Sequence, residues 1–361
     1  MATAANQYSP DYSVPPGWVL EERLEVEGMS HAEFARRCGR SPKLISEIIS
    51  GKAPLEPGTA LQFEKVLGVD ASLWLGIEAD YRLHRARETE AGEAVAFAEW
   101  VKAFPVRDLV KRGCFQRPES DVDAVSKLLA FFRVGSVGAW NARYGFANVA
   151  YRHSPTFKSN EAALATWLRL GEIEAERQEC ADYHESRFRH AIRTIRGLTR
   201  EEIGEALQQT TTLCNEAGVA LALVQPLPRT ALSGAAWWLS PRKAVIQLTA
   251  RHKTDDHLWF SFFHEAAHVL LHSKRGIFVD ETSANGAGLE AEANEWASNT
   301  LVSRSAWQQF AATSPRSARV VRAFAEEQGI APGIVVGMLQ HNGLLPWTHL
   351  NALKVRLAWE S

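Results

Sequence analysis

Residues 244–272 read AVIQLTARHKTDDHLWFSFFHEAAHVLLH, and this stretch decides the fold of the C-terminal part of the chain. It opens with an apolar run at 244–249 that has the length and composition of a buried strand. Two earlier apolar runs, 219–224 and 235–239, are expected to be strands as well. Because Ser-Pro-Arg-Lys at 240–243 favours a turn, the sequence predicts a hairpin between the last two strands.

The rest of the chain has helical periodicity, which predicts a mainly α fold with a small β-sheet (α+β). We expect a loose tail at 1–14, a five-helix domain at 15–88, a helical connecting domain at 89–215 and a C-terminal domain at 216–361. The individual helical stretches are expected at 160–189, at 199–217, near 257–273 and near 288–302, with a helical tail to the C-terminus.

Composition excludes several classes of protein. Of the 361 residues 46% are hydrophobic, and 40 Lys and Arg nearly balance 42 Asp and Glu. Intrinsic disorder and a polycation that coats nucleic acid are therefore excluded, and any DNA contact must come from a local patch. The four cysteines are far apart, as in free thiols of a reducing compartment, and no apolar stretch approaches the length of a membrane span. We expect a cytoplasmic protein without membrane contact.

The segment 31–51, HAEFARRCGRSPKLISEIISG, has the pattern of a helix-turn-helix. Ala35 lets two helices approach closely, Gly39 supplies the positive φ of a tight turn, and Ile45 anchors the second helix. Cap signals open both helices, at Ser30 with Glu33 and at Ser41 with Pro42. An ordinary helical hairpin is the alternative, since the spacing is degenerate.

The second helix of this motif would lie in the major groove of a double-stranded DNA operator. Its DNA-contacting residues are predicted to be Arg40, Ser41, Lys43, Ser46 and Glu47. Between 30 and 52 the chain has five basic and two acidic residues, and this local charge of +3 is enough for several phosphate contacts.

His264-Glu265-Ala-Ala-His268 is the sharpest chemical signal in the chain. Residues four apart share one face of a helix, so both imidazoles can bind one Zn²⁺ ion. Glu265 is the candidate catalytic residue, because from that position it can take a proton from water and pass it to a leaving amine. Chance alone would place such a string in roughly a few per cent of chains with this many histidines.

The third ligand must come from another helix. His272 continues the stripe, but eight residues of helix span about 12 Å, too far for one ion. On the next helix Glu290 falls about 60° from the centre of the apolar stripe and Glu292 about 100°, so only one can point inward. We predict Glu290 as the ligand and Asn294 as the partner of a ligating histidine, with a solvated glutamate as the alternative. Three protein ligands and an open position are typical of a catalytic zinc site.

Such a site favours hydrolysis of an amide, and the strand at 244–249 is a candidate edge for an extended peptide substrate. The helper that stabilises the oxyanion is not identified by the sequence. His252, His257 and His272 are near in sequence, and each fits a structural role better than a catalytic one.

Residues 15–88 also resemble the XRE/HigA-type antitoxin-repressor domains. The shared sequence motifs are Pro15-Pro16-Gly17, the turn glycine, Ser50-Gly51-Lys52 and the Leu-Trp-Leu around Trp74. This resemblance implies a homodimer on an operator. His31 replaces the glutamine that such domains usually carry.

Residues from about 216 to 345 resemble the ImmA/IrrE metallopeptidase family, which has a gluzincin-like fold. The similar segments begin at Lys243 (KAVIQLTARHKTDDHLWFSFFHEAAHVLLH), Glu290 (EAEANEWASNTLV) and Gly329 (GIAPGIVVGMLQH). The resemblance implies zinc on His264, His268 and Glu290, with Glu265 catalytic. It also implies a protein substrate of the XRE-repressor type.

Three hypotheses follow. The first is a DNA-binding regulator with a zinc-dependent endopeptidase that cuts a transcription regulator. The second is a HigA-like antitoxin and repressor that binds a toxin, its zinc domain serving as scaffold or sensor. The third is a zinc-binding regulator without turnover. We favour the first, because Glu265 has no role in metal binding alone.

Overall fold

The structure is a computed structural model that describes residues 13–144, 161–228, 232–249, 254–272, 278–279 and 287–357. The predicted tail at 1–14 lies outside these residues except for its last two positions. The chain forms two compact units, one built from 1–98 with 120–122 and the other from 99–119 with 123–361. Most of the predicted connecting domain therefore belongs to the same unit as the sheet, and the predicted boundaries within that unit stay predictions.

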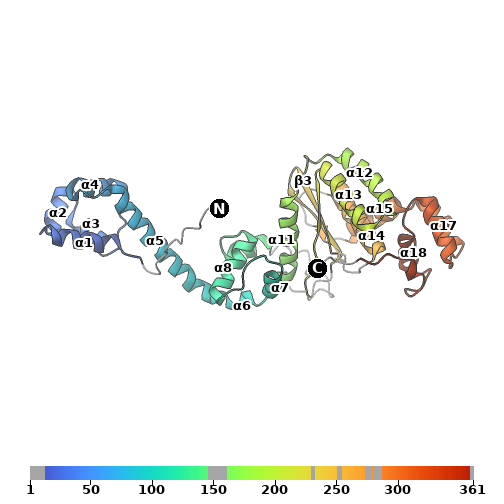
Figure 1. Cartoon of the computed structure of the whole chain (residues 1–361), viewed down its shortest axis with the longest axis horizontal. Coiled ribbons are helices and arrows are strands. Elements are labelled where there is room, and N and C mark those ends of the chain that lie inside the picture. Colours follow the sequence, from blue (N-terminus) through green and yellow to red (C-terminus); the bar gives the residue numbers. More distant parts are fainter. Residues whose placement is uncertain are drawn as a thin grey trace, which may run out of the picture. The chain divides into compact units, whose positions relative to one another are not determined.

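The N-terminal unit contains the five predicted helices (Figure 1). They are α1 (Pro16–Val26), α2 (His31–Cys38), α3 (Pro42–Ile49), α4 (Pro57–Leu67) and α5 (Ala71–Ala94), followed by the short helix η1 (Val95–Phe97). Their apolar faces meet in one core, in which Phe63 packs edge-to-face against Phe34 at 4.8 Å and against Trp74 at 5.6 Å. Burial of large aromatic rings of this kind is the main stabilising contribution in so small a unit.

Local sequence signals explain where α2 and α3 begin and end. The Ser30 hydroxyl accepts a hydrogen bond from Glu33 N at 3.2 Å, and the Ser41 hydroxyl accepts one from Leu44 N at 3.2 Å. Gly39 ends α2 with a φ of 63°, which a side chain would make unfavourable. These observations confirm the predicted caps and turn.

Gly17 explains how α1 packs against the end of α3. A Cβ at this position would lie 2.2 Å from the backbone oxygen of Ile49, so only glycine allows the two helices to approach this closely. The glycine of the Pro-Pro-Gly motif therefore lets α1 contact the end of α3.

The second unit begins with helices on either side of residues 145–160, which lie outside the described part of the chain. They are α6 (Ala98–Val101), α7 (Val106–Lys111), α8 (Asp121–Phe132), α9 (Val137–Tyr144), α11 (Glu161–Arg177), α12 (Glu185–Leu198) and α13 (Ile203–Glu216). The single helical run predicted for 160–189 is wrong, because α11 ends at Arg177 and α12 begins only at Glu185. In between, the Gln178 side chain hydrogen-bonds both backbone groups of Leu221, at 2.9 and 3.2 Å. The backbone N–H groups of Ala181, Tyr183 and His184 donate to carbonyl groups of residues 215, 242 and 217 instead of to helical partners.

The predicted strands form a mixed sheet. They are β1 (Val219–Leu223), β2 (Gly234–Ser240) and β3 (Lys243–Leu248), and a short strand that was not predicted, β4 (Phe278–Val279), joins them in the order β1-β3-β2-β4. β2 and β3 form the predicted antiparallel hairpin, and β1 runs parallel to β3. The expectation that 244–249 is an edge strand is wrong, because parallel pairing with β1 places β3 in the interior of the sheet.

The two faces of this sheet are covered by different helices (Figure 1). Alternate residues such as Leu221 and Ile246 face α12, α13 and α14, and their neighbours Ala220 and Val245 face α11. The strands are therefore buried on both sides, which explains their continuous apolar runs.

The C-terminal part is helical, as predicted. It contains α14 (Asp255–Leu271), α15 (Ala287–Leu301), α16 (Arg304–Ala312), α17 (Ala318–Gln328), α18 (Pro332–His341) and η2 (Asn351–Leu353). α14 is packed between the sheet and the helices α15 and α18, and its apolar residues are at the centre of the largest core. Within the described part of the chain, no helix combines the length and apolarity that crossing a membrane requires. The fold is thus mainly α with a small sheet.

Candidate metal centre and candidate DNA-binding helix

The side chains of His264, His268 and Glu290 meet where α14 packs against α15. One ligand atom from each lies within 4.8 Å of the others. The two imidazole Nε2 atoms are 3.0 Å apart, and the Glu290 carboxylate oxygens lie 3.1 Å from His264 Nε2 and 3.4 Å from His268 Nε2. The structure thus brings together the three predicted ligands.

The outer nitrogens of both histidines are held by neighbouring side chains. His264 Nδ1 is 3.0 Å from Asn294 Oδ1, so this nitrogen donates its proton to the amide oxygen and Nε2 is left with a free lone pair. His268 Nδ1 is 2.8 Å from His272 Nδ1. Such outer contacts fix the orientation of ligating imidazoles.

His272 flanks the centre without belonging to the three predicted ligands. Its other nitrogen lies 3.4 Å from Glu292 Oε2, so the two residues that we excluded as ligands contact one another outside the centre. The signal was present, because His272 follows His268 by one helical turn. Glu292 is 57% exposed in its side chain and Glu290 only 17%, so only Glu290 points inward.

These residues fit a zinc ion. Two imidazole nitrogens on a tetrahedral zinc are roughly 3.3 Å apart, close to the separation between the two histidines. Burial lowers the pKa of His268, which favours its neutral form. Burial alone would raise the pKa of Glu290, but the contacts of its carboxylate with His264 and His268 outweigh burial and hold that pKa at about 2. Neutral imidazoles and an ionised carboxylate are the forms that bind a metal.

Glu265 is completely buried on the side of α14 that faces the sheet. Gly234, the first residue of β2, lies directly against it: a Cβ there would be 2.5 Å from Glu265 Oε1 and 2.8 Å from its Cγ. The backbone of Gly234 has no positive φ, so the close approach of the carboxylate alone requires glycine. Sequence reasoning missed Gly234, whose only signal is a glycine at the start of an apolar strand.

The other histidines have different surroundings. His264 stacks on Phe260 with ring centroids 6.4 Å apart, and Phe262 and Phe263 are buried in the core, as the bulky segment predicted. His257 precedes His264 by seven residues, which places it roughly 10 Å away along the helix. His252 lies outside the described residues.

The candidate DNA-contacting residues lie on α3 and just before it. Ser41, Lys43 and Ser46 are exposed. Glu47 is partly buried, and its Oε1 is 3.8 Å from Lys43 Nζ. Arg40 is also partly buried, and its Nε donates a hydrogen bond to Gln62 Oε1 on α4 at 2.6 Å. The structure therefore groups four of the five candidates on α3 and its N-cap. The fifth, Arg40, contacts α4 of the same unit.

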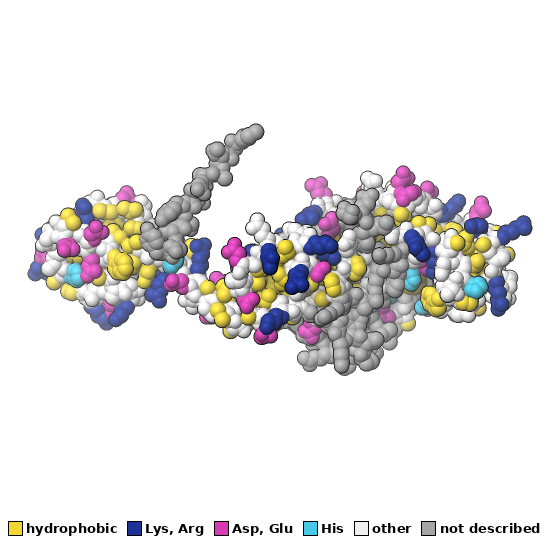
Figure 2. All heavy atoms as spheres, turned by 60° about the horizontal axis from the view of Figure 1, so that its bottom comes forward, with side chains coloured by type: hydrophobic (Ala, Val, Ile, Leu, Met, Phe, Trp, Pro, Cys, Tyr) yellow, Lys and Arg dark blue, Asp and Glu magenta, His cyan; other side chains and the backbone are white. Residues whose placement is uncertain are grey.

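The two arginines of α2 are paired with an acidic side chain of the same helix. Arg36 and Arg37 both pair with Glu33, and hydrogen bonds from Arg37 and Arg36 hold the pKa of Glu33 below its usual value. On the faces shown in Figure 2, basic and acidic side chains are interspersed. Of the basic side chains on α2 and α3, that of Lys43 is the most exposed, at 85%.

Both units are similar to known proteins. Residues 223–336 match the IrrE N-terminal-like domain of peptidase family M78. YddM of Escherichia coli K12, described as an uncharacterized HTH-type transcriptional regulator, is 32% identical over 74 residues, which is 20% of this chain and 79% of YddM.

Two solved structures also match, each over 22% of this chain. One, described as an antidote protein of a plasmid maintenance system from Nostoc punctiforme, is 28% identical with 89% of its length covered and a TM-score of 0.22. The other, an addiction module antidote protein of the HigA family from Coxiella burnetii, is 23% identical with 88% covered and a TM-score of 0.21.

Proposed function

We propose that this chain joins DNA binding to a zinc-dependent endopeptidase. The chain belongs to the HTH-type transcriptional regulators and carries an IrrE N-terminal-like domain, and the proposal starts from these two facts. Its substrate in this proposal is a repressor-type protein. The observation that carries the proposal is the meeting of three ligand atoms within 4.8 Å beside a fully buried glutamate. A site that only stored zinc has no use for Glu265.

Each residue has one task in this proposal. His264, His268 and Glu290 hold the ion, while Asn294 and His272 keep the imidazole rings in position. Bound zinc would polarise the scissile carbonyl and make water more acidic. Glu265 takes the proton from the attacking water and delivers it to the leaving amine, and Gly234 sets its position.

The N-terminal unit supplies the operator contact. In our proposal α3 enters the major groove as part of a homodimer, with Lys43 on a phosphate and Ser46 and Glu47 towards the bases. The exposure of Lys43 and Ser46 supports this orientation.

Cleavage of one copy by another tests the peptidase. The full-length Glu265→Gln protein, which has an unchanged N-terminal unit, serves as substrate, and β-casein serves as a general one. We expect the zinc-loaded wild type to produce fragments, and we expect none from Glu265→Gln alone or after chelation. Equal fragments from both proteins would exclude the assigned mechanism.

The same samples test the antitoxin alternative. In one outcome the zinc-loaded wild type cuts neither substrate, and wild type and Glu265→Gln neutralise a toxin equally well. This outcome would favour a HigA-like antitoxin. In that case the zinc domain acts as a scaffold or sensor.

A further inference from the structure

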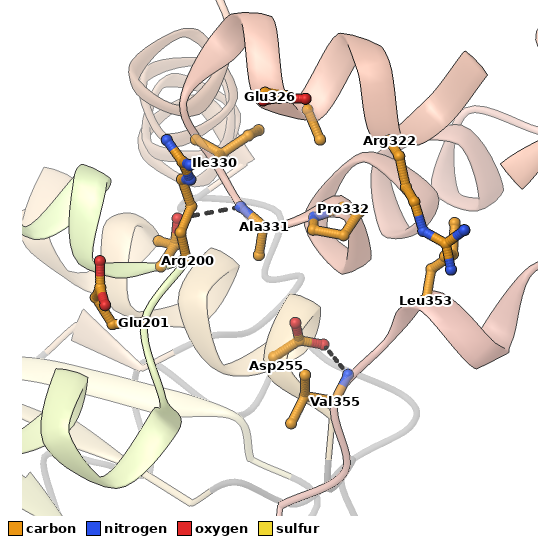
Figure 3. Close-up of a pocket in the computed structure, with 12 residues that line it drawn as sticks. Arg200, Glu201, Asp255, Arg322, Glu326, Ile330, Ala331, Pro332, Leu353 and Val355 are labelled. Carbon is orange, nitrogen blue, oxygen red and sulfur yellow. Dashed lines mark hydrogen bonds between the residues drawn. The ribbon is translucent and has the colours of Figure 1, made fainter. Parts of the chain in front are cut away.

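A cavity of about 260 Å³ lies at the opposite end of α14 from the metal centre (Figure 3). It is lined by the connection between α12 and α13, by the first residue of α14, by α17 and by the chain around η2. Asp255, which lines it, precedes His264 by nine residues, so the cavity is roughly 14 Å along the helix from the metal centre. It is therefore a separate site.

Asp255 is a buried carboxylate at this cavity, only 3% exposed. Its Oδ1 accepts a hydrogen bond from Val355 N at 2.9 Å, and its own backbone N donates to Val355 O at 2.9 Å (Figure 3). Gly333 on α18 also lies against it, because a Cβ there would be 2.7 Å from both carboxylate oxygens. The position of the carboxylate is therefore fixed from two sides.

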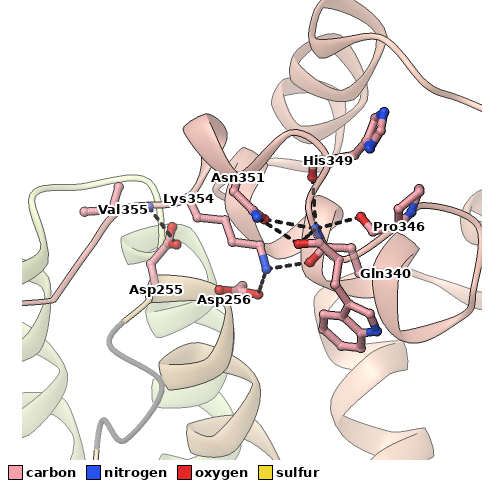
Figure 4. A network of polar contacts seen from close by, with 9 residues as sticks. Asp255, Asp256, Gln340, Pro346, His349, Asn351, Lys354 and Val355 are labelled. Atoms are coloured by element: carbon pink, nitrogen blue, oxygen red, sulfur yellow. Dashed lines mark hydrogen bonds and ion pairs between the residues drawn. The ribbon is translucent and has the colours of Figure 1, made fainter.

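Two adjacent acids begin α14, and only one has a cation. Lys354 Nζ lies 2.6 Å from Asp256 Oδ2 and donates a second bond to Gln340 Oε1 at 2.7 Å (Figure 4). Among the residues that the structure describes, no Lys, Arg or His pairs with Asp255. A buried carboxylate without a partner charge is costly unless something else provides that charge.

The electrostatic state of Asp255 agrees with this geometry. Burial raises its pKa to about 6, against the Val355 hydrogen bond and with a further contribution from the Asp256 charge. The first turn of a helix favours negative charge, and Asp255 shares this turn of α14 with Asp256. Near pH 8 Asp255 is consequently an anion that faces the cavity.

The remaining lining residues define the shape of a ligand. The floor is apolar and buried, and it includes Ile330, Ala331 and Leu353. Four exposed charged residues line the rim, two of each sign, and they balance one another: Arg200, Glu201, Arg322 and Glu326. The net charge of the lining is therefore that of Asp255.

We propose that this cavity binds an alkylammonium group, with the ammonium on the Asp255 carboxylate and the aliphatic chain on the apolar floor. The group belongs either to a small free amine or to a lysine side chain of another protein. This site is independent of the endopeptidase proposal, because none of its residues contacts the metal ligands.

Isothermal titration calorimetry on the full-length protein tests the site with three probes of equal length: n-butylammonium, n-butanol and butyrate. We expect n-butylammonium to bind better than the other two, and to bind more tightly at pH 8 than at pH 5, where Asp255 is protonated. The other charged groups around Asp255 are Asp256, which is paired with Lys354, and the four residues of the rim. Equal binding of all three probes, or a preference for butyrate, would overturn the proposal.

Asp255→Asn is the matched variant, because asparagine keeps the acceptor for Val355 N and removes only the charge. It should weaken n-butylammonium binding by roughly tenfold or more. Glu327→Gln removes an exposed carboxylate of α17 that does not line the cavity, and it should leave binding unchanged. Unchanged binding in Asp255→Asn would contradict the proposal, and the probe comparison on wild type stands even if this variant does not fold.

A lysine tripeptide with blocked ends distinguishes the two sources. If it binds as well as n-butylammonium, the site accepts a protein lysine. If only the free amine binds, the site is one for a small amine. Failure of all amines overturns the assignment.

Discussion

The metal centre and the exposed face of α3 place their functional residues in opposite surroundings. At the metal centre each side chain is fixed by another, His264 by Asn294 and His268 by His272. On α3, Lys43 and Ser46 face solvent, and Lys43 Nζ lies 3.8 Å from Glu47 Oε1. Side chains that need an accurate arrangement are thus buried, whereas side chains proposed to contact a partner are exposed.

This difference predicts large effects from single substitutions in the first region and small ones in the second. Removal of a buried, mutually supported group changes the whole arrangement. Removal of one exposed group changes one contact.

The largest effect is expected from Glu290→Ala. This variant lacks one of three protein ligands, so its zinc affinity should fall by more than the roughly 10–100-fold that loss of an outer contact costs. Metal analysis of purified protein by plasma mass spectrometry measures this. Glu292→Ala is the control, because this residue is on the same helix with its side chain 57% exposed. If both variants keep one equivalent of zinc, Glu290 is not a ligand.

Gly234→Ala should reduce cleavage by roughly 100-fold and leave the zinc content near that of wild type. The added methyl group displaces the Glu265 carboxylate, because the three atoms nearest to it all belong to Glu265. The ratio of kcat/KM to bound zinc measures the effect. Gly171→Ala is the control, since its Cβ would overlap Gln247 Oε1 at 2.0 Å on the other face of the sheet. Equal loss of activity in both variants would show that overpacking alone is responsible.

Asn294→Ala should weaken zinc binding by about 10–100-fold without abolishing it. The reason is that His264 keeps its Nε2 donor but loses the hydrogen bond that orients its ring. Competition with a chromogenic chelator measures the affinity. Asn294→Asp, which keeps the acceptor, should restore most of it. A Kd in Asn294→Ala that equals that of wild type would mean that the 3.0 Å contact does not orient the ring.

The sequence was sufficient for those parts of the fold that depend on local pattern. The strands, the hairpin and the caps at Ser30 and Ser41 all have signals within a few residues. The inward direction of Glu290 depends on the helical period alone, and the structure agrees with it.

Features that depend on distant partners were missed or wrong. The interior place of β3 depends on β1, more than 20 residues earlier, and the break after Arg177 depends on the backbone of Leu221. Gly234 is required by a side chain from another element. Each of these is a long-range contact, which periodicity and spacing do not encode.

The smallest effect is expected from Lys43→Ala, and it tests the exposed side of the comparison. Loss of one phosphate contact should weaken operator binding several-fold and reduce the slope of log K against log salt by about 1. The folding of the unit should not change, because this side chain is 85% exposed. Arg40→Ala differs, since its bond to Gln62 joins α4 to the turn, and we expect it to lower thermal stability as well as affinity. Fluorescence anisotropy at several salt concentrations, together with thermal melts, separates the two variants. A salt slope that stays unchanged in Lys43→Ala would mean that α3 meets DNA through another face, and a lowered melting temperature would mean that this surface is less independent than its exposure indicates.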